Sequence, residues 1–480
     1  MSGVSIRLYW WHLGIAIVSA IALYANSSVA QITPDGTLPN NSNVQLEGNT
    51  RIISGGTQAG SNLFHSFSEF SVPTNSTALF KNAADIQNII SRVTGNSISN
   101  IDGLIRANGT ANLFLMNPNG IIFGQNARLD IGGSFFATSA NSMKFADGFE
   151  FSAKNPQPTP LLTISVPIGL QFGANPGLIQ VQGNGQGARD FDSPIIDTQD
   201  ALRVQPDKTL ALIGGDINLE GATLKTAGGR IELGSVAENN LVSLTPTNKG
   251  FALGYGGVQN FGNIQLSQQA TVDASGEGGG DIQVQGRRVT VTNGSHIETS
   301  TLGAKQGGDL VVNAIESVEA SGLSSGLAAQ VYPKATGSAG NLTINTRELL
   351  VRDGATVSSS TSGAGKGGDL TVNAQTVELI GESADSLSFL SSNSEATGNA
   401  GNLTINTREL LVRDGAGVST GAQNAGKGGD LTVIAQIVEL IGESADGLSS
   451  SGLFSDSEAT GNAGNLTINT RELLVRDGAG

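Results

Sequence analysis

Apolar and polar residues alternate in short runs along the second half of the chain. In residues 370–374, which read LTVNA, the apolar side chains occupy every second position, and this period is typical of a β-strand with one buried face. A second apolar run follows at residues 377–379, and a third run lies at residues 355–358 of the preceding unit. Gly, Ser, Thr and Asn interrupt every window long enough for an amphipathic helix. The pattern therefore predicts short strands joined by turns, and it argues against a helical solenoid.

These strands belong to a repeat. The sequence GSAGNLTINTRELLVRDGA at residues 337–355 returns with one substitution at 398–416 and again at 461–479, and GKGGDLTV interleaves at 365–372 and 426–433. The spacings between equivalent polar residues are 28, 32, 28, 33, 28 and 35, measured from Asp281 through Asp309, Asn341, Asp369, Asn402 and Asp430 to Asn465. Three short strands and three turns in about thirty residues predict one coil of a parallel β-helix.

We therefore predict an all-β fold, a right-handed parallel β-helix (β-solenoid) with an N-terminal capping domain. The repeat array is expected at residues 270–480, and because the sequence ends within a repeat, we expect the array to be incomplete at its C-terminus. Twelve of the 17 phenylalanines lie in residues 64–172, which predicts a denser core there than in the array. This density suits an N-terminal domain that caps the rod and folds first.

The first thirty residues have the layout of a secretory signal peptide. They contain one charge, Arg7, then an apolar core at residues 13–23, and then small residues before Gln31. The apolar core is about half the roughly twenty residues that a membrane-spanning helix needs. We predict a signal peptide at residues 1–30 that is cleaved between Ala30 and Gln31, and no stable transmembrane segment in the mature chain.

Charge and composition exclude some partners. The net charge is −15, and loss of Arg7 with the signal peptide makes it −16. Because binding to phosphates takes clustered Lys and Arg, nucleic acid is excluded as a partner. The chain has no cysteine, so a secreted form must hold together without disulfides, which a continuous stacked β core can do.

The most informative short motif is a turn-forming tetrapeptide made of Asn117, Pro118, Asn119 and Gly120. Asn at the first position of a β-turn bonds the backbone, Pro presets φ at the second, and Gly closes the turn. Apolar runs at residues 113–116 and 121–123 predict two buried strands folded about this turn. By itself the motif is equally consistent with an ordinary surface hairpin.

The surroundings of the motif resemble a known family. Residues 60–82 (GSNLFHSFSEFSVPTNSTALFKN), 85–124 (DIQNIISRVTGNSISNIDGLIRANGTANLFLMNPNGIIFG) and 127–140 (ARLDIGGSFFATSA) resemble the filamentous haemagglutinin N-terminal domain, in its cyanobacterial version. This is the secretion domain of two-partner systems. The resemblance covers residues 31–175, which we take as the secretion domain, with a longer boundary at about residue 270 as the alternative. The NPNG motif of the family maps onto Asn117 to Gly120, whereas a second family motif, of NPNL type, has no clear match.

The resemblance implies a two-partner secretion exoprotein. Such a chain crosses the inner membrane by the Sec translocon, is recognised unfolded by periplasmic domains of a cognate outer-membrane β-barrel transporter, and folds progressively outside. The expected product is a haemagglutinin-like adhesin, secreted or on the cell surface, that contacts an unknown surface receptor or glycan. Two alternatives stay open: the stalk of a contact-dependent toxin, and a β-helical polysaccharide-active enzyme.

Candidate catalytic and metal chemistry is weak in this sequence. Of three histidines, His12 lies in the signal peptide, His65 is predicted to pack in the core, and His296 is predicted on an exposed turn. None is near a metal-ligand or triad pattern. Both tryptophans lie in the signal peptide, and near-identical coils suit length better than one active site. We predict no enzyme, no catalytic residue, no metal and no cofactor.

Polar residues of the repeat are interpreted structurally. The acids after Gly pairs recur about every sixty residues with Asn between, unlike the nine-residue GGxGxD repeat of calcium-binding β-rolls, so a turn-forming role is expected. Arg408 and Glu409, like Arg347 and Glu348, are expected in solvated charge ladders. The Asn-Leu-Thr sequons of the repeat could accept glycans, but their strand-start position favours a structural role.

Overall fold

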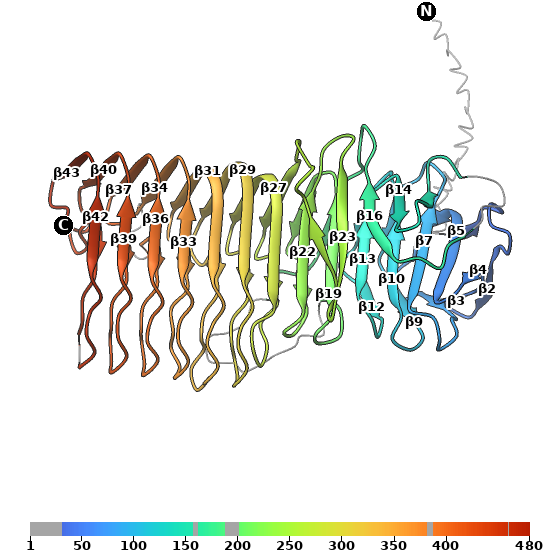
Figure 1. The fold of residues 1–480 in the computed structure, drawn as a ribbon, viewed down its shortest axis with the longest axis horizontal. Helices are drawn as coiled ribbons and strands as arrows, with labels where there is room; N and C mark the ends of the chain where they lie inside the picture. Colours follow the sequence, from blue (N-terminus) through green and yellow to red (C-terminus); the bar gives the residue numbers. More distant parts are fainter. Residues whose placement is uncertain (1–30, 157–161, 188–200, 382–386, 459) are drawn as a thin grey trace, which may run out of the picture.

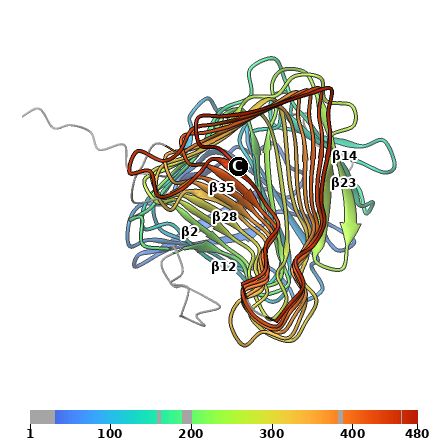
Figure 2. The ribbon, with the colours of Figure 1, turned by 90° about the vertical axis from the view of Figure 1, so that its left-hand side faces the viewer.

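The computed structural model of the chain describes residues 31–156, 162–187, 201–381, 387–458 and 460–480. Within these residues the chain forms β-strands and no helix. The strands stack along one axis and build a rod, which Figure 1 shows from the side and Figure 2 from its end. The predicted all-β parallel β-helix is confirmed. No helix among the described residues is long and apolar enough to cross a membrane.

The first face of the rod is a parallel ladder that runs its whole length. Its strands are β5 (Asn62–Phe70), β7 (Asn88–Val93), β10 (Asn112–Met116), β13 (Phe135–Thr138), β19 (Thr209–Gly214), β22 (Arg230–Ser235), β27 (Asp281–Thr292), β29 (Leu310–Ser321), β31 (Leu342–Arg352), β33 (Leu370–Asn373), β36 (Leu403–Asn406), β39 (Leu431–Ile434) and β42 (Leu466–Asn469).

The second face is a parallel ladder around the next corner of each coil. Its strands are β8 (Ser99–Ile101), β11 (Ile121–Phe123), β17 (Ile179–Gln182), β20 (Ile217–Glu220), β25 (Asn263–Ser267), the second halves of β27, β29 and β31, and then β34 (Thr376–Ile380), β37 (Glu409–Arg413), β40 (Ile437–Ile441) and β43 (Glu472–Arg476).

In three coils the first-face strand and the second-face strand are not separate, although the sequence predicted two short strands per coil at this place. β27, β29 and β31 each run through both faces, and the corner is marked only by register shifts, between Gly286 and Arg288 and between Ala314 and Ser317. In later coils the corner residues leave the ladder, which gives the separate strands β33 and β34 that the sequence predicted.

The third face is built from two sheets in succession. The N-terminal one contains β2 (Ser42–Glu47), β3 (Thr50–Gly55), β6 (Thr77–Phe80), β9 (Leu104–Ala107) and β12 (Arg128–Asp130). The C-terminal one contains β18 (Leu202–Arg203), β21 (Thr223–Lys225), β26 (Thr271–Asp273), β28 (His296–Glu298), β30 (Gly326–Ala328), β32 (Thr356–Ser358), β35 (Phe389–Ser391), β38 (Gly417–Ser419) and β41 (Gly452–Phe454).

The interior of the rod is a column of aliphatic side chains. Leu342, Leu370, Leu403 and Leu431 occupy one register position on successive first-face strands, and all four are fully buried. Along each strand, the polar residues that alternate with the buried ones point outward, as the two-residue period of a β-strand requires. Each coil therefore buries its apolar face only against its neighbours, which is how repeat architectures build a core.

Antiparallel strands cover the N-terminal end of the rod. β1 (Ile32–Pro34) and β4 (Thr57–Ala59) both pair antiparallel with β5, and β2 forms a hairpin with β3. An uncovered first coil would present a row of unpaired backbone groups, so these strands remove an edge that could pair with another chain.

A separate antiparallel sheet lies outside the rod. It consists of β15 (Glu150–Ser152), β14 (Ser142–Phe145), β16 (Pro167–Gln171), β23 (Leu241–Thr247) and β24 (Gly250–Gly254), in that order. Its strands come from two excursions of the chain, one between β13 and β17 and one between β22 and β25, and Figure 2 shows β14 and β23 beside the outer wall of the rod. We call it the outer sheet.

The outer sheet creates a second hydrophobic core on the outside of the first face. Phe114 and Phe136 project outward from β10 and β13, with their rings stacked at 4.5 Å, and Phe251 of β24 lies 5.6 and 5.7 Å from them. The strands under this sheet are consequently buried on both sides, as β7 and β19 are along their entire length. The density of phenylalanine in this region therefore reflects a two-sided ladder as well as a terminal cap.

Candidate export motif

The NPNG motif forms the corner between the first and second faces of one coil. The preceding strand β10 pairs with β7 and β13, and the following strand β11 pairs with β8 and β17, all in parallel. β10 and β11 do not pair with each other, so the hairpin interpretation is wrong. The turn redirects the chain from one face to the next, and its residues are buried between neighbouring coils and not on the surface, apart from the half-buried Asn119.

The turn chemistry expected from the sequence is present. The amide of Gly120 donates to the carbonyl of Asn117 at 3.0 Å, and Asn117 Oδ1 accepts from the amide of Asn119 at 3.0 Å. Gly120 has a φ of 113°, and a Cβ there would lie 2.7 Å from the carbonyl oxygen of Leu178. Only glycine fits such a backbone without strain.

The side chain of Asn117 joins its corner to the preceding coil. It is fully buried, and its Nδ2 donates to the carbonyl of Ser97 at 3.0 Å and to Ser99 Oγ at 2.9 Å. Its backbone amide donates to the carbonyl of Thr138 in the following coil at 2.9 Å. Both amide protons and the side-chain oxygen are therefore used, which is what a buried amide requires.

Asn119 continues the same connection outward. Its Nδ2 donates to the carbonyl of Gly95 at 2.8 Å, and its Oδ1 accepts from Lys154 Nζ at 3.1 Å. Lys154 follows β15 of the outer sheet. The carbonyl of Pro118 accepts from the amide of Gly177 at 3.1 Å, ahead of β17. The motif thus links the coil before it, the coil after it and the outer sheet.

A buried arginine lies one coil before the motif, and sequence reasoning did not single it out. Arg92 on β7 is 2% exposed; its Nε donates to Ser66 Oγ at 2.8 Å, its Nη1 to the carbonyl of Ser152 at 2.7 Å, and its Nη2 to Thr37 Oγ1 at 2.9 Å. Its guanidinium lies 4.1 Å from the ring centre of Phe151. The only signal in the sequence was a charged residue inside the apolar run NIISRV.

Asp35 completes this cluster from the N-terminal segment. It accepts hydrogen bonds from Ser66 Oγ at 2.6 Å, Thr94 Oγ1 at 2.7 Å and the amide of Thr37 at 3.0 Å. Burial lowers the pKa of Arg92 to about 10, and the charge of Asp35 opposes that shift. The cluster ties the N-terminal cap, the first two coils and the outer sheet together.

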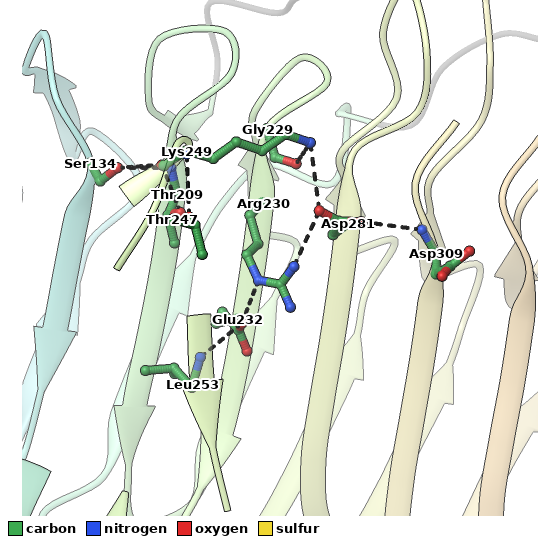
Figure 3. A network of polar contacts seen from close by, with 10 residues as sticks. All are labelled: Ser134, Thr209, Gly229, Arg230, Glu232, Thr247, Lys249, Leu253, Asp281 and Asp309. Carbon is green, nitrogen blue, oxygen red and sulfur yellow. Dashed lines mark hydrogen bonds and ion pairs between the residues drawn. The ribbon is translucent and has the colours of Figure 1, made fainter. Parts of the chain in front are cut away.

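A second polar network fastens the outer sheet at its other end (Figure 3). Glu232 on β22 is fully buried, and its Oε1 accepts from Arg230 Nε at 2.6 Å and from the amide of Leu253 on β24 at 3.3 Å. Glu232 Oε2 and the hydroxyl of Tyr255 have no hydrogen-bond partner among the described residues. Burial raises the pKa of Glu232 to about 7, because desolvation outweighs the attraction of Arg230.

The network reaches from the outer sheet to the start of the array. Asp281 Oδ2 pairs with Arg230 Nη1 at 3.1 Å and with Lys249 Nζ at 3.5 Å. The carbonyl of Lys249 accepts from Ser134 Oγ and Thr209 Oγ1, both at 2.9 Å. Figure 3 shows the side chains of Arg230 and Lys249 both reaching Asp281.

From Asp281 onward, Asp and Asn form a ladder along the array. Asp309 Oδ1 accepts from the amide of Asn341 at 2.8 Å, Asn341 Oδ1 from the amide of Asp369 at 3.1 Å, and Asp369 Oδ1 from the amide of Asn402 at 2.9 Å. These hydrogen bonds explain the expected structural role of the residues, including Asn341 of the sequon. Each side-chain oxygen accepts a hydrogen bond from a backbone amide of the next coil. No group of three or more His, Cys, Asp or Glu able to hold a metal occurs among the described residues.

The histidine predictions have different outcomes. His65 is 1% exposed, its Nδ1 lies 3.0 Å from Ser42 Oγ, and burial lowers its pKa to about 3, so the predicted core packing is confirmed. The predicted position of His296 on an exposed turn is wrong. The turn consists of Asn293 and Gly294, both with positive φ, and His296 is the first residue of β28, half-buried between parallel strands.

The remaining predicted residues are located as follows. Arg408 and Glu409 form an ion pair at 3.0 Å with both side chains solvent-exposed, so the predicted solvation is confirmed, but this pair joins neighbours within one coil and is no ladder between coils. The predicted signal peptide, including Ala30 of the cleavage site, lies outside the described residues, and Gln31 is the first residue described.

Comparisons with known proteins point to secretion. The family model of the TPS secretion domain matches residues 30–284. The HMW1 secretion domain from Haemophilus influenzae has a similar structure, with a TM-score of 0.57 and 18% identity over 93% of this chain and 100% of that chain. The filamentous hemagglutinin secretion domain aligns with a TM-score of 0.31 and 13% identity over 84% and 99% of the two chains. No curated protein matches the chain.

Proposed function

Because the chain belongs to the TPS secretion domain family, the haemagglutinin-like exoproteins of two-partner secretion systems, we propose that its N-terminal domain directs export through a cognate outer-membrane β-barrel transporter. The proposed route begins with the signal peptide and the Sec translocon, passes through the periplasm, and ends with the chain in the medium or on the cell surface. There the β-helix acts as an adhesin in cell or surface contact.

The observation that carries this proposal is the burial of the motif. Asn117 is fully buried and bonded to both neighbouring coils, so a transporter could contact its side chain only before the coil closes. We therefore infer that the transporter recognises the unfolded motif, and that the same four residues then form a corner of the folded coil. Folding outside the cell would bury the motif, so the transporter could not bind it again and release would be irreversible.

The outer sheet supports a longer secretion unit than residues 31–175. Strands β23 and β24 belong to the same sheet as β14–β16, although about seventy residues of sequence separate the two groups. We propose that the export unit ends after this second excursion, at about residue 270, which is the longer of the two boundaries considered from the sequence. The array of residues 270–480 is then the part of the chain that this unit exports.

The experiment is an export assay in cells that express the chain with its cognate transporter, the adjacent gene being the first candidate. Asn117→Ala should reduce the chain in the medium and on the surface at least about tenfold. Asn155→Ala, which truncates an exposed Asn outside the NPNG turn, is the matched control and should be exported normally. Normal export of N117A, or export of the wild type without any transporter, would contradict the proposal.

A further inference from the structure

Between coils two apart, which the sequence repeat makes equivalent, the third face diverges most. On the first and second faces β36 and β42 both read LTIN, and β37 and β43 both read ELLVR. The pairs β33/β39 (LTVN and LTVI) and β34/β40 (TVELI and IVELI) differ at one residue each. On the third face the equivalent pairs are β32/β38, which read TVS and GVS, and β35/β41, which read FLS and GLF. Their central residues stay aliphatic and buried, so the coil fixes the inner position, whereas the outward residues change from coil to coil. Variation concentrated on one side of a repeat is typical of a binding face.

The outward changes produce a groove across β35, β38 and β41. The outward residues of the middle coil are small, with Gly417 and Gly421 at the two ends and Ser419 between them. Phe389 from the coil before and Phe454 from the coil after lie over Gly417: a Cβ there would overlap the Phe389 ring and lie 3.1 Å from that of Phe454. The groove has a volume of about 810 Å³, and both rings that line it are half-exposed.

Polar groups line the same groove. Asn393 Oδ1 accepts from Ser419 Oγ at 2.9 Å and from the amide of Gly421 at 2.7 Å, which fixes the orientation of its side-chain amide. Its Nδ2 makes no hydrogen bond to the described residues, and as a donor it is available to a ligand. Asp456 and Glu458 line the groove and are exposed.

The chemistry of these groups selects a class of ligand. Aromatic rings stack on the apolar C–H faces of sugar rings, while amide and carboxylate groups bind hydroxyls, and a site of several hundred Å³ with a few convergent polar groups is the usual form of a small-ligand site. The described residues that line the groove include two carboxylates and no Lys or Arg, so an acidic glycan would be repelled. We propose that this groove binds a neutral oligosaccharide. The proposal rests on the adhesin function proposed above and names the receptor class.

The test is affinity electrophoresis of the purified chain in gels that contain dextran, mannan or galactomannan, with polygalacturonate as the acidic probe. At least one neutral polysaccharide should retard the wild type, and polygalacturonate should not. The double variant F389A/F454A should bind about tenfold more weakly, since two stacking contacts are lost. The matched control L350A/L411A truncates two half-buried apolar residues of the second face and should bind normally.

Three results would overturn the proposal: no retardation by any neutral polysaccharide, retardation by polygalacturonate, or unchanged binding by F389A/F454A. Circular dichroism checks that this variant is folded, and Asp456→Asn, which keeps the fold and weakens one polar contact, should lower affinity severalfold. Adhesion of cells separates this inference from the proposed function. If cells bearing the chain adhere but the purified chain binds no neutral glycan, the groove assignment is wrong and the adhesin function is retained. If the chain binds a neutral glycan but adhesion does not depend on the chain, the groove assignment is retained and the adhesin function is wrong.

Discussion

Single buried polar residues hold the export domain together at its corners. Asn117 uses both side-chain protons and its oxygen, and Arg92 uses three donors on three separate segments. A buried polar group that loses its partner costs about 1–3 kcal/mol, more than the net gain from making the bond. Replacing Asn117 by Ala would remove the donor to Ser99 Oγ and to the carbonyl of Ser97. The corner is therefore fully hydrogen-bonded only when neighbouring coils stack in the correct register.

Glu232 provides a residue-scale prediction about pH. Its pKa is raised from 4.5 to about 7 by burial, so the folded state binds a proton more tightly than the unfolded state. Stability contributed by this proton is fully present below the unfolded pKa and is lost as the pH rises through 7. The wild type should therefore lose up to about 3 kcal/mol from this group between about pH 4.5 and pH 7.

The variant E232Q should be more stable than the wild type at pH 8 and should lack this part of the pH dependence. His65, with its pKa lowered to about 3, destabilises the fold in the opposite direction, as the pH falls below about 6.5. Because His65 is common to both proteins, the difference between their melting temperatures at pH 5 and pH 8 isolates Glu232. Parallel pH profiles for E232Q and the wild type would show that Glu232 is ionised in the folded state.

At the scale of elements, the array is held in register by side-chain ladders on strands that are otherwise nearly identical. Asn345 Nδ2 donates to Asn313 Oδ1 and Asn373 Nδ2 to Asn345 Oδ1, both at 2.8 Å, which adds one bond between each pair of coils. From Asp309 onward, Asp alternates with Asn in the strand-start ladder; before it, Asp281 and Asp309 are successive acids, and Asp281 is paired with Arg230 and Lys249. The alternation has a physical reason: both supply the acceptor, but carboxylates in successive coils would be about 4.8 Å apart and would repel.

The ladder predicts the effect of one added charge. N341D places a carboxylate between Asp309 and Asp369, and each like-charge pair at this spacing costs about 1 kcal/mol in water. The melting temperature should fall at pH 7, and the loss should disappear at pH 3 or in 1 M salt, where the charge is neutralised or screened. The control T343D adds the same charge on the same strand without acidic neighbours and should have little effect. A loss that persists at pH 3 would mean that the amide itself is required.

At the Asn117 corner, the turn could be predicted from the sequence, but the pairing of the two flanking strands could not. Its turn residues were identifiable, since the hydrogen bonds of Asn117 and the φ of Gly120 are local and follow from residue type. Whether β10 and β11 form a hairpin or a corner depends on their partners β7, β13, β8 and β17, and a tight turn serves either arrangement. His296 was misplaced for a similar reason, because the turn ends at Gly294 and the chain is already in β28 at His296.

At the scale of the whole molecule, periodicity in the array was sufficient to predict the coil, the strands and the parallel stacking. The outer sheet was not predictable in the same way. Its strands alternate like coil strands, occur once, and are brought together from two excursions that lie far apart in the sequence. The phenylalanines marked its position, but their function as a second core outside the first face depends on which side of β10 and β13 each ring occupies.

This architecture suits export in the unfolded state. The cap and the first coils form a template, and each later coil adds buried area and a ladder of hydrogen bonds to a preformed edge, as in other repeat proteins. The outer sheet, tied by Arg92 near its start and by the Glu232 network at its end, closes only after about residue 254 has emerged. The export unit would therefore become fully stable just before the array begins to stack.

The most direct test of the central claim separates recognition of the motif from stability of the corner. Asn117→Ala and Ser99→Ala both remove the hydrogen bond from Asn117 Nδ2 to Ser99 Oγ, but only the first alters the motif. With the stability of both purified variants measured by thermal unfolding, export through the cognate transporter is quantified in cells. The account predicts that S99A is exported at near the wild-type level and N117A at least about tenfold less. Export that falls equally in both variants, in proportion to their loss of stability, would contradict recognition of the unfolded motif.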